Sequence, residues 1–209
     1  MKLYDCTTAP SPRRVRIFAA EKGIQLENVQ VDLAAGAQFS DAFRAINPDC
    51  VVPVLELDDG THITEVLAIC RYLEELHPEP SLFGRTPEER ATSVAWLTKI
   101  EQQGLMAMRD AFRNSAKGLK GHALTGPVGY EQIPELAERG RHCVTTFFGR
   151  LEQQLVANEY VAGAFYSIAD ITALVLVDFA AWIKIELPDN AVNLRRWHEK
   201  VASRPSARA

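Results

Sequence analysis

Residues 51–69 decide the fold, and they read VVPVLELDDGTHITEVLAI. Within this stretch, Asp58-Asp59-Gly60 separates two apolar runs at residues 51–57 and 62–64, which is a strong β-hairpin signal. Residues 65–76 follow without a loop and carry apolar side chains at helical spacing. The stretch therefore predicts two antiparallel strands that lead directly into an amphipathic helix.

The residues before this hairpin alternate between strand and helix signals. Two further strands and one short helix are predicted, at residues 1–5, 26–33 and 40–46. Another helix is predicted over residues 13–22, with Ser11 as its N-cap, Pro12 at its first position and Gly23 at its end. The order β-α-β-α-β-β-α predicts a four-stranded mixed sheet, because the hairpin strands must be antiparallel.

The second half of the chain is predicted to be all-helical. Pro78 and Pro80 break the preceding helix, and Thr86 begins a long helix as N-cap, with Glu89 as its capping-box partner. Further helices are predicted at residues 131–155, 169–185 and 191–202, with a loop at 117–130. The chain is thus predicted to have an α/β domain at 1–78 and an all-α domain at 86–209.

The composition argues against several classes of protein. With 23 Lys and Arg against 27 Asp and Glu, the net charge of −4 argues against a nucleic-acid partner. No apolar run approaches the roughly 20 residues of a membrane-spanning helix, and no signal-peptide core is found. The 4 cysteines lack paired spacing and are interpreted as reduced thiols of a cytoplasmic protein. The 5 histidines fit no metal-ligand pattern, so no metal is expected.

The turn at residues 6–12 offers groups that stabilise an anion. The helix after it directs free backbone N–H groups and the positive end of its dipole at the turn, and Ser11 adds a hydroxyl. The alternative is that Ser11 serves only as a helix cap. Cys6 lacks the second cysteine of a redox pair, so it is interpreted as a buried or strand-end thiol.

Three further signals each have a structural and a functional interpretation. Val52-Pro53 places a proline at the start of a strand, which is typical of an edge strand or of a cis bond that exposes the Val52 backbone to an added peptide strand. Glu65 either complements a helix dipole or holds a ligand ammonium beside helix N–H groups that hold the ligand's carboxylate. Arg109 and Arg113 belong to a solvated helix face or line a cleft.

The whole chain resembles a cytosolic glutathione S-transferase, in which a thioredoxin-like domain precedes a helical domain. The matching motifs follow the family's order: SPRRVRI at 11–17, INP at 46–48, VPVL at 52–55, TEVLAI at 64–69, YVAG at 160–163 and a capping box at 167–170. The sequence is especially similar to fungal and bacterial members that depart from the Tyr, Ser and Cys classes.

The resemblance implies that glutathione is the co-substrate. Val52, before the family's cis-proline at Pro53, would pair its backbone with the cysteinyl part of glutathione. Glu65 and Val66 would hold the γ-glutamyl end. Gln38, before the second helix, would contact the glycyl end.

Two departures from the family pattern bear on the mechanism. Val66 replaces the usual Ser and removes one hydroxyl contact, worth about 0.5–1.5 kcal/mol. Ala9 stands where serine-type members place their catalytic hydroxyl, and Ser11 is the nearest substitute. We therefore predict that Ser11 and the helix amides at residues 12–14, of which Pro12 itself donates none, stabilise the glutathione thiolate, which attacks a hydrophobic electrophilic small molecule.

The second substrate is expected between the two halves, against the long helix, where Leu105, Met108, Arg109 and Phe112 are candidates. Two alternatives to a transferase remain open: a non-catalytic glutathione-binding or interaction module, and a glutathione-dependent peroxidase or thiol-disulfide reductase that uses Cys6. From the resemblance we also expect a cytoplasmic homodimer that serves detoxification.

Overall fold

The computed structural model describes residues 1–209, which form two compact units. The first unit comprises residues 1–80, 124–129 and 209, and the second comprises residues 81–123 and 130–208. The domain limits predicted from the sequence are 1–78 and 86–209. Residues 124–129, which belong to the predicted loop at 117–130, are thus part of the first unit.

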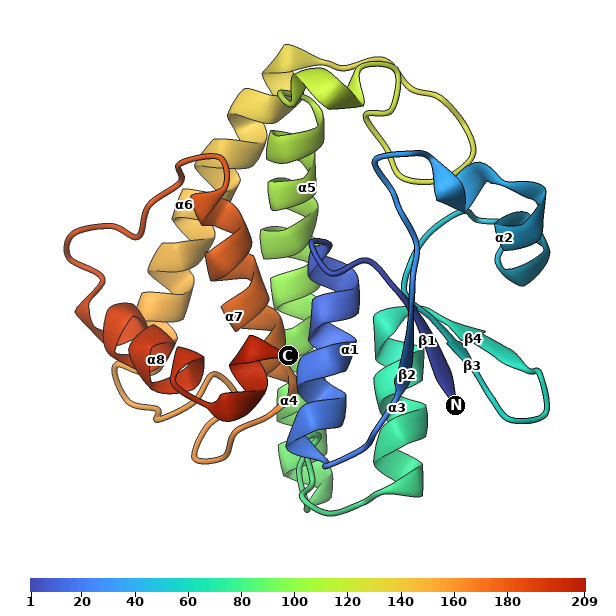
Figure 1. Cartoon of the computed structure of the whole chain (residues 1–209). Coiled ribbons are helices and arrows are strands. Elements are labelled where there is room, and N and C mark those ends of the chain that lie inside the picture. Colours follow the sequence, from blue (N-terminus) through green and yellow to red (C-terminus); the bar gives the residue numbers. More distant parts are fainter. The chain divides into compact units, whose positions relative to one another are not determined.

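The first unit is built on one four-stranded sheet (Figure 1). Its elements, in chain order, are β1 (Lys2–Asp5), α1 (Pro10–Glu21), β2 (Glu27–Gln30), a 3₁₀ turn (Ala37–Phe39), α2 (Asp41–Ile46), β3 (Val54–Glu56), β4 (His62–Thr64) and α3 (Val66–Leu76). The strands lie in the order β2-β1-β3-β4, with β1 parallel to β2 and the other pairs antiparallel. The predicted mixed sheet and hairpin are confirmed.

Alternation along the strands gives the sheet two apolar faces. Leu3 and Leu55 pair across β1 and β3 and are fully buried. Helices α1 and α3 lie next to each other (Figure 1). Tyr4 points to the opposite face, where its ring packs edge-on against Phe43 of α2 at 6.1 Å between centroids. Val54 joins Phe43 in this second cluster. The sheet is therefore covered on both sides.

Helix α1 begins earlier than predicted. Ala9 is its N-cap and Pro10 its first residue, so the assignment of Ser11 as N-cap and Pro12 as first position is wrong. A proline fits anywhere in the first turn, because the N–H groups there have no acceptor within the helix. Two prolines at this spacing are both compatible with that turn, and the sequence does not choose between them.

The second unit consists of helices. They are α4 (Pro87–Lys99), a π-helical segment (Ile100–Leu105), α5 (Met106–Arg113), a 3₁₀ turn (Lys117–Leu119), α6 (Pro134–Leu155), α7 (Ile168–Ala181), α8 (Val192–Ala202) and a last 3₁₀ turn (Pro205–Arg208). The all-helical prediction is confirmed. None of these helices, nor any in the first unit, is long and apolar enough to cross a bilayer.

The predicted long helix after Thr86 is continuous in space but changes its winding at residues 100–105, which are π-helical. Gly104 lies in this segment and is packed closely, since a Cβ added there would come within 2.4 Å of the Leu176 side chain in α7. The sequence suggests only a bend at Gly104. The winding depends on packing against a helix some 70 residues further along the chain. A local sequence pattern carries no information about such a distant contact.

Both predicted capping boxes are present. Thr86 Oγ1 accepts from the Glu89 N–H at 3.2 Å, and Glu89 Oε2 accepts from the Thr86 N–H at 3.3 Å. Asp170 closes the second box with Ser167 and also accepts from the indole Nε1–H of Trp197 at 2.8 Å. Asp170 is completely buried, and this burial raises its pKa to about 6. It fixes the start of α7 and faces no open site.

Candidate functional site

The sheet topology brings the predicted site residues to one end of the sheet. Asp5, at the end of β1, pairs with Gln30 at the end of β2. Val54, at the start of β3, pairs with Tyr4 on one side and with Thr64, at the end of β4, on the other. The segments that follow β1, β2 and β4 and the segment that precedes β3 therefore meet at the same end. They contain Ser11, Gln38, Glu65, Val66, Val52 and Pro53.

The segment before β3 presents backbone groups without partners. The Val52–Pro53 bond is cis, as the resemblance implies. The edge-strand alternative is wrong, because β3 lies between β1 and β4. Neither the N–H nor the C=O of the half-buried Val52 is hydrogen-bonded within the chain, whereas the Val51 C=O accepts from Asn47 Nδ2 at 2.9 Å. An extended peptide can pair with Val52 as an added strand.

Glu65 stands in a strained backbone conformation between β4 and α3. Its φ is 67°, a value that non-glycine residues rarely adopt, at a cost of about 1–3 kcal/mol. Its exposed side chain does not cap α3. Helix α3 starts at Val66, so the first N–H groups, at residues 66–68, have no acceptor within the helix. An exposed carboxylate beside free amides suits an ammonium and a carboxylate on one ligand.

The first turn of α1 offers fewer amide donors than predicted. The Ala9 N–H donates to the Cys6 C=O at 2.8 Å, and the Arg13 N–H already donates to the Ala9 C=O at 3.4 Å. Pro10 and Pro12 have no N–H. The backbone N–H of Ser11 is therefore the one free donor of this turn, and the predicted set of amides at residues 12–14 is wrong.

The Ser11 hydroxyl is also available at this turn. Arg14 Nη2 donates to Ser11 Oγ at 3.4 Å, while Arg14 itself is buried. The hydroxyl hydrogen of Ser11 has no acceptor within the chain. Ser11 is not the helix cap, so the interpretation that it serves only as a cap is not supported.

A buried polar network holds the turn in place, and it includes residues that the sequence analysis missed. Asp5, only 1% exposed, accepts from Arg16 Nη1 and from Gln30 Nε2, the latter at 2.8 Å. Arg16 Nη2 also donates to the Thr7 C=O at 3.0 Å, and Gln30 Oε1 accepts from the Thr7 N–H at 3.0 Å. These bonds join residues from β1, α1 and β2. No local sequence signal identifies them.

Gln38 lies in the 3₁₀ turn before α2, and its side-chain oxygen is buried without a hydrogen-bond partner. A buried acceptor without a donor is uncommon in a folded protein, and a ligand N–H would satisfy it. Gln38 thus remains suited to the contact predicted for it.

The structure gives little support for cysteine-based redox chemistry or for metal chemistry at this end of the sheet. All four cysteines are free thiols, and Cys6 Sγ lies 3.5 Å from Thr8 Oγ1 with no second cysteine beside it. No group of three or more His, Cys, Asp and Glu side chains is placed to hold a metal ion.

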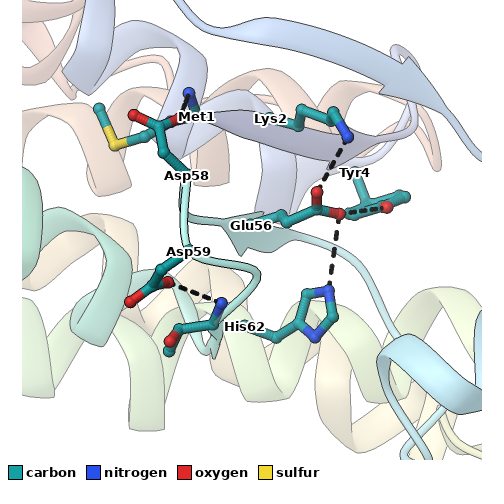
Figure 2. Close-up of polar contacts among 8 residues, drawn as sticks. Met1, Lys2, Tyr4, Glu56, Asp58, Asp59 and His62 are labelled. Carbon is teal, nitrogen blue, oxygen red and sulfur yellow. Dashed lines mark hydrogen bonds and ion pairs between the residues drawn. The ribbon is translucent and has the colours of Figure 1, made fainter.

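The other end of the sheet carries a charged cluster that is already satisfied. Figure 2 shows the Glu56 carboxylate accepting from Tyr4 OH at 2.6 Å and from Lys2 Nζ at 2.9 Å, with His62 Nε2 at 3.6 Å. The Tyr4 hydrogen bond, followed by that from Lys2, lowers the pKa of Glu56 to about 2. These contacts join β1, β3 and β4 and leave the carboxylate with little capacity for a ligand.

Comparison with known proteins agrees with this architecture. Residues 8–76 match the model of the glutathione S-transferase N-terminal domain, and residues 91–205 match that of the C-terminal domain. Glutathione S-transferase 2 of Saccharomyces cerevisiae is 35% identical over 100% of this chain and 88% of its own length. The mouse maleylacetoacetate isomerase is 31% identical over 88% of this chain and 80% of its own length.

Solved structures give the same result. A glutathione S-transferase domain-containing protein of Marinobacter aquaeolei VT8 superimposes with a TM-score of 0.90 at 37% identity, over 99% of both chains. Gtt2 of Saccharomyces cerevisiae also reaches a TM-score of 0.90 at 35% identity, over 99% of this chain and 98% of its own. The chain belongs to the glutathione S-transferase family. The predicted thioredoxin-like first domain, helical second domain and transferase class are confirmed.

Proposed function

We propose that this protein conjugates glutathione to small electrophiles, and that glutathione binds at the end of the sheet as an added strand beside Val52. The observation that carries the proposal is the Val52 backbone, whose N–H and C=O have no partners within the chain. A peptide needs such a pair of groups to extend a sheet. The cysteinyl part of glutathione supplies the complementary C=O and N–H.

The neighbouring groups match the two ends of the tripeptide. The Glu65 carboxylate pairs with the γ-glutamyl ammonium, and the Val66 N–H at the start of α3 donates to the γ-glutamyl carboxylate. The side-chain amide of Gln38 meets the glycyl end. Pro53 fixes the backbone turn between Val52 and β3. Each contact uses a group that has no competing partner in the protein.

The first turn of α1 supplies the activation of the thiol. A free thiol has a pKa of about 8.5, and lowering it by about 2 units takes roughly 2.7 kcal/mol. A partly buried helix N-terminus contributes up to about 2 kcal/mol, and one charge-assisted hydrogen bond contributes about 1.5–3 kcal/mol. The Ser11 hydroxyl, assisted by the Ser11 N–H, therefore suffices to stabilise the thiolate, and no general base is required.

Titration of the bound thiol tests the role of Ser11. The thiolate absorbance of glutathione at saturation is followed against pH in the wild type and in Ser11→Ala, with Cys6→Ser as the matched control. Ser11→Ala should raise the thiol pKa by about 1 unit or more and reduce the conjugation of chlorodinitrobenzene. Cys6→Ser should change neither. An unchanged thiol pKa in Ser11→Ala would remove the hydroxyl from the mechanism.

Calorimetry with reduced glutathione tests binding itself. Glu65→Gln removes the charge that faces the ligand ammonium and should weaken binding by about tenfold or more, as expected for a charged hydrogen bond. The absence of any heat with the wild type at millimolar glutathione would overturn the assignment of this site.

The wider role is proposed on the same basis. An apolar electrophile as second substrate and a role in detoxification follow from the family. The four free thiols are compatible with a reducing cytoplasm, where we place the protein. We also propose a homodimer, and sedimentation of the purified protein tests that state directly.

A further inference from the structure

Thr7, in the turn between β1 and α1, is held by side chains from two other elements. Its N–H and its hydroxyl both donate to Gln30 Oε1 at the end of β2, at 3.0 and 2.8 Å. Its C=O accepts from Arg16 Nη2 of α1 at 3.0 Å. All three polar groups of Thr7 therefore have partners within the chain, although the residue itself is exposed. Surface turns are ordinarily among the more mobile parts of a protein, so this fixation is unusual.

Asp5 links the two side chains that hold Thr7. Its buried carboxylate accepts from Arg16 Nη1 through Oδ1, and from Gln30 Nε2 through Oδ2 at 2.8 Å. The Arg16 side chain is itself only 10% exposed. The four residues form a closed ring of hydrogen bonds, which we call the Thr7 clamp, and the charges of Asp5 and Arg16 balance within it. Because the clamp carries no net charge, its influence on a nearby thiol comes from position rather than from a net field.

The turn that contains Thr7 leads directly into the first turn of α1. The Ala9 N–H donates to the Cys6 C=O at 2.8 Å and closes a four-residue turn, and Ala9 is the N-cap of α1. Ser11 follows two residues later, and neither its N–H nor its hydroxyl hydrogen is donated to an acceptor in the chain. The position of Ser11 therefore depends on the turn before it and on the helix after it.

We propose that Asp5, Arg16 and Gln30 are positioning residues for thiol activation, because they fix Thr7 and thereby the placement of Ser11 at the glutathione thiol. Their part in activation rests on the proposed function, whereas the hold of the clamp on the turn does not. A hydrogen bond weakens steeply as its geometry departs from the optimum, and a misplacement of about 1 Å can cost roughly 100-fold in rate. Gln30 on β2 thus influences the thiol without a hydrogen bond to Ser11.

Gln30→Leu is the most informative variant of the clamp. Asp5 and Arg16 form a buried ion pair, so the replacement of either one threatens the fold. Gln30 is exposed on β2 at the edge of the sheet, and its replacement by leucine changes no charge. Asn28→Leu is the matched control, because Asn28 is exposed on the same strand and its side chain makes no hydrogen bond within the chain.

The thiolate absorbance of bound glutathione is titrated in the wild type, in Gln30→Leu, in Ser11→Ala and in the double variant. Gln30→Leu should raise the thiol pKa by about 0.5–1 unit, roughly half of what a charge-assisted hydrogen bond contributes. In the Ser11→Ala background it should add less than about half of that rise, because the hydroxyl that it displaces is absent. At neutral pH, kcat should fall while the KM for glutathione changes little, since Val52 and Glu65 hold the tripeptide from other segments. Asn28→Leu should alter none of these quantities.

Hydrogen exchange in the absence of glutathione tests the hold on the turn independently of activity. The informative amide is that of Ala9, because the substitution does not touch its bond to the Cys6 C=O. Loss of the two bonds from Thr7 to Gln30 should speed the exchange of the Ala9 amide by about fivefold or more in Gln30→Leu. The exchange rate should stay at the wild-type value in Asn28→Leu.

The proposal and the proposed function fail in different ways. If Ser11→Ala raises the thiol pKa but Gln30→Leu leaves it unchanged, Ser11 keeps its role and the positioning proposal is refuted. An equal rise from Gln30→Leu with and without the Ser11 hydroxyl also refutes it, because the effect then does not pass through Ser11. If Ser11→Ala leaves the thiol pKa unchanged, the role of the hydroxyl fails and the positioning proposal falls with it. An unchanged exchange rate of the Ala9 amide in Gln30→Leu refutes the clamp whatever the activity.

Discussion

Replacing Lys22 with methionine removes a charge from the interior of the first unit. The Lys22 side chain is fully buried at the end of α1, with Nζ 2.6 Å from Glu74 Oε2 on α3. The same ammonium donates to the C=O groups of His77 and Pro80 at 2.6 and 2.8 Å. It thereby joins the ends of α1 and α3 to the segment that leaves the first unit.

The size of the effect follows from what each partner loses. Glu74 is only 9% exposed, and removal of one member of a buried ion pair costs about 3–5 kcal/mol. His77 and Pro80 are exposed, so water can replace the ammonium at their carbonyl groups and little is added to the cost. We therefore expect Lys22→Met to lower the free energy of unfolding by about 3–5 kcal/mol.

Urea denaturation followed by far-UV circular dichroism measures this loss. The double variant Lys22→Met/Glu74→Leu should recover most of it, because no charge then remains buried. Lys200→Met is the control, since it breaks an exposed ion pair with Glu159 and should cost less than about 1 kcal/mol. A loss below about 1 kcal/mol in Lys22→Met, or a double variant no more stable than the single one, would refute the reasoning.

Three further predictions address packing, pH and ligand affinity. Gly140→Ala would place a Cβ 2.5 Å from a carbonyl oxygen of α5 and should cost about 1–3 kcal/mol in thermal unfolding, whereas Gly149→Ala, on the same helix with open space around it, should be neutral or stabilising. Because folding lowers the pKa of Glu56 from its ordinary 4.5 to about 2, its contribution to stability is complete above 4.5 and disappears as the pH falls towards about 2. Tyr4→Phe should therefore lower the urea midpoint more at neutral pH than at the acid end of that range, and an equal loss at both would contradict the assignment. Val66→Thr keeps the shape of the side chain and restores a hydroxyl at the start of α3, so glutathione affinity by calorimetry should rise by about 2- to 12-fold; unchanged or weaker binding would show that no hydroxyl contact is missing there.

Local signals account for most of the fold that the sequence predicts. Thr86 with Glu89, and Ser167 with Asp170, form capping boxes within four residues, so the helix starts they define are found at the predicted residues. The start of α1 is different, because Pro10 and Pro12 satisfy the same rule and only the structure distinguishes them.

The sequence identifies individual residues of the candidate site, but it does not show that they lie close together. Val52 and Glu65 are each identified by a local feature, but their convergence depends on the strand order of the sheet. The Asp5 and Arg16 contact that holds the first turn, and the contact between Asp170 and the Trp197 indole, join residues 11 and 27 positions apart. Contacts of this kind arise from packing between elements, so no short motif reports them.

The location of the glutathione sulfur is the most direct test of the central claim. A crystal structure of the protein with reduced glutathione should show the cysteinyl N–H and C=O paired with the Val52 backbone and the sulfur within hydrogen-bond distance of Ser11 Oγ. Glutathione bound with its sulfur away from the first turn of α1, or with Val52 still unpaired, would contradict the account.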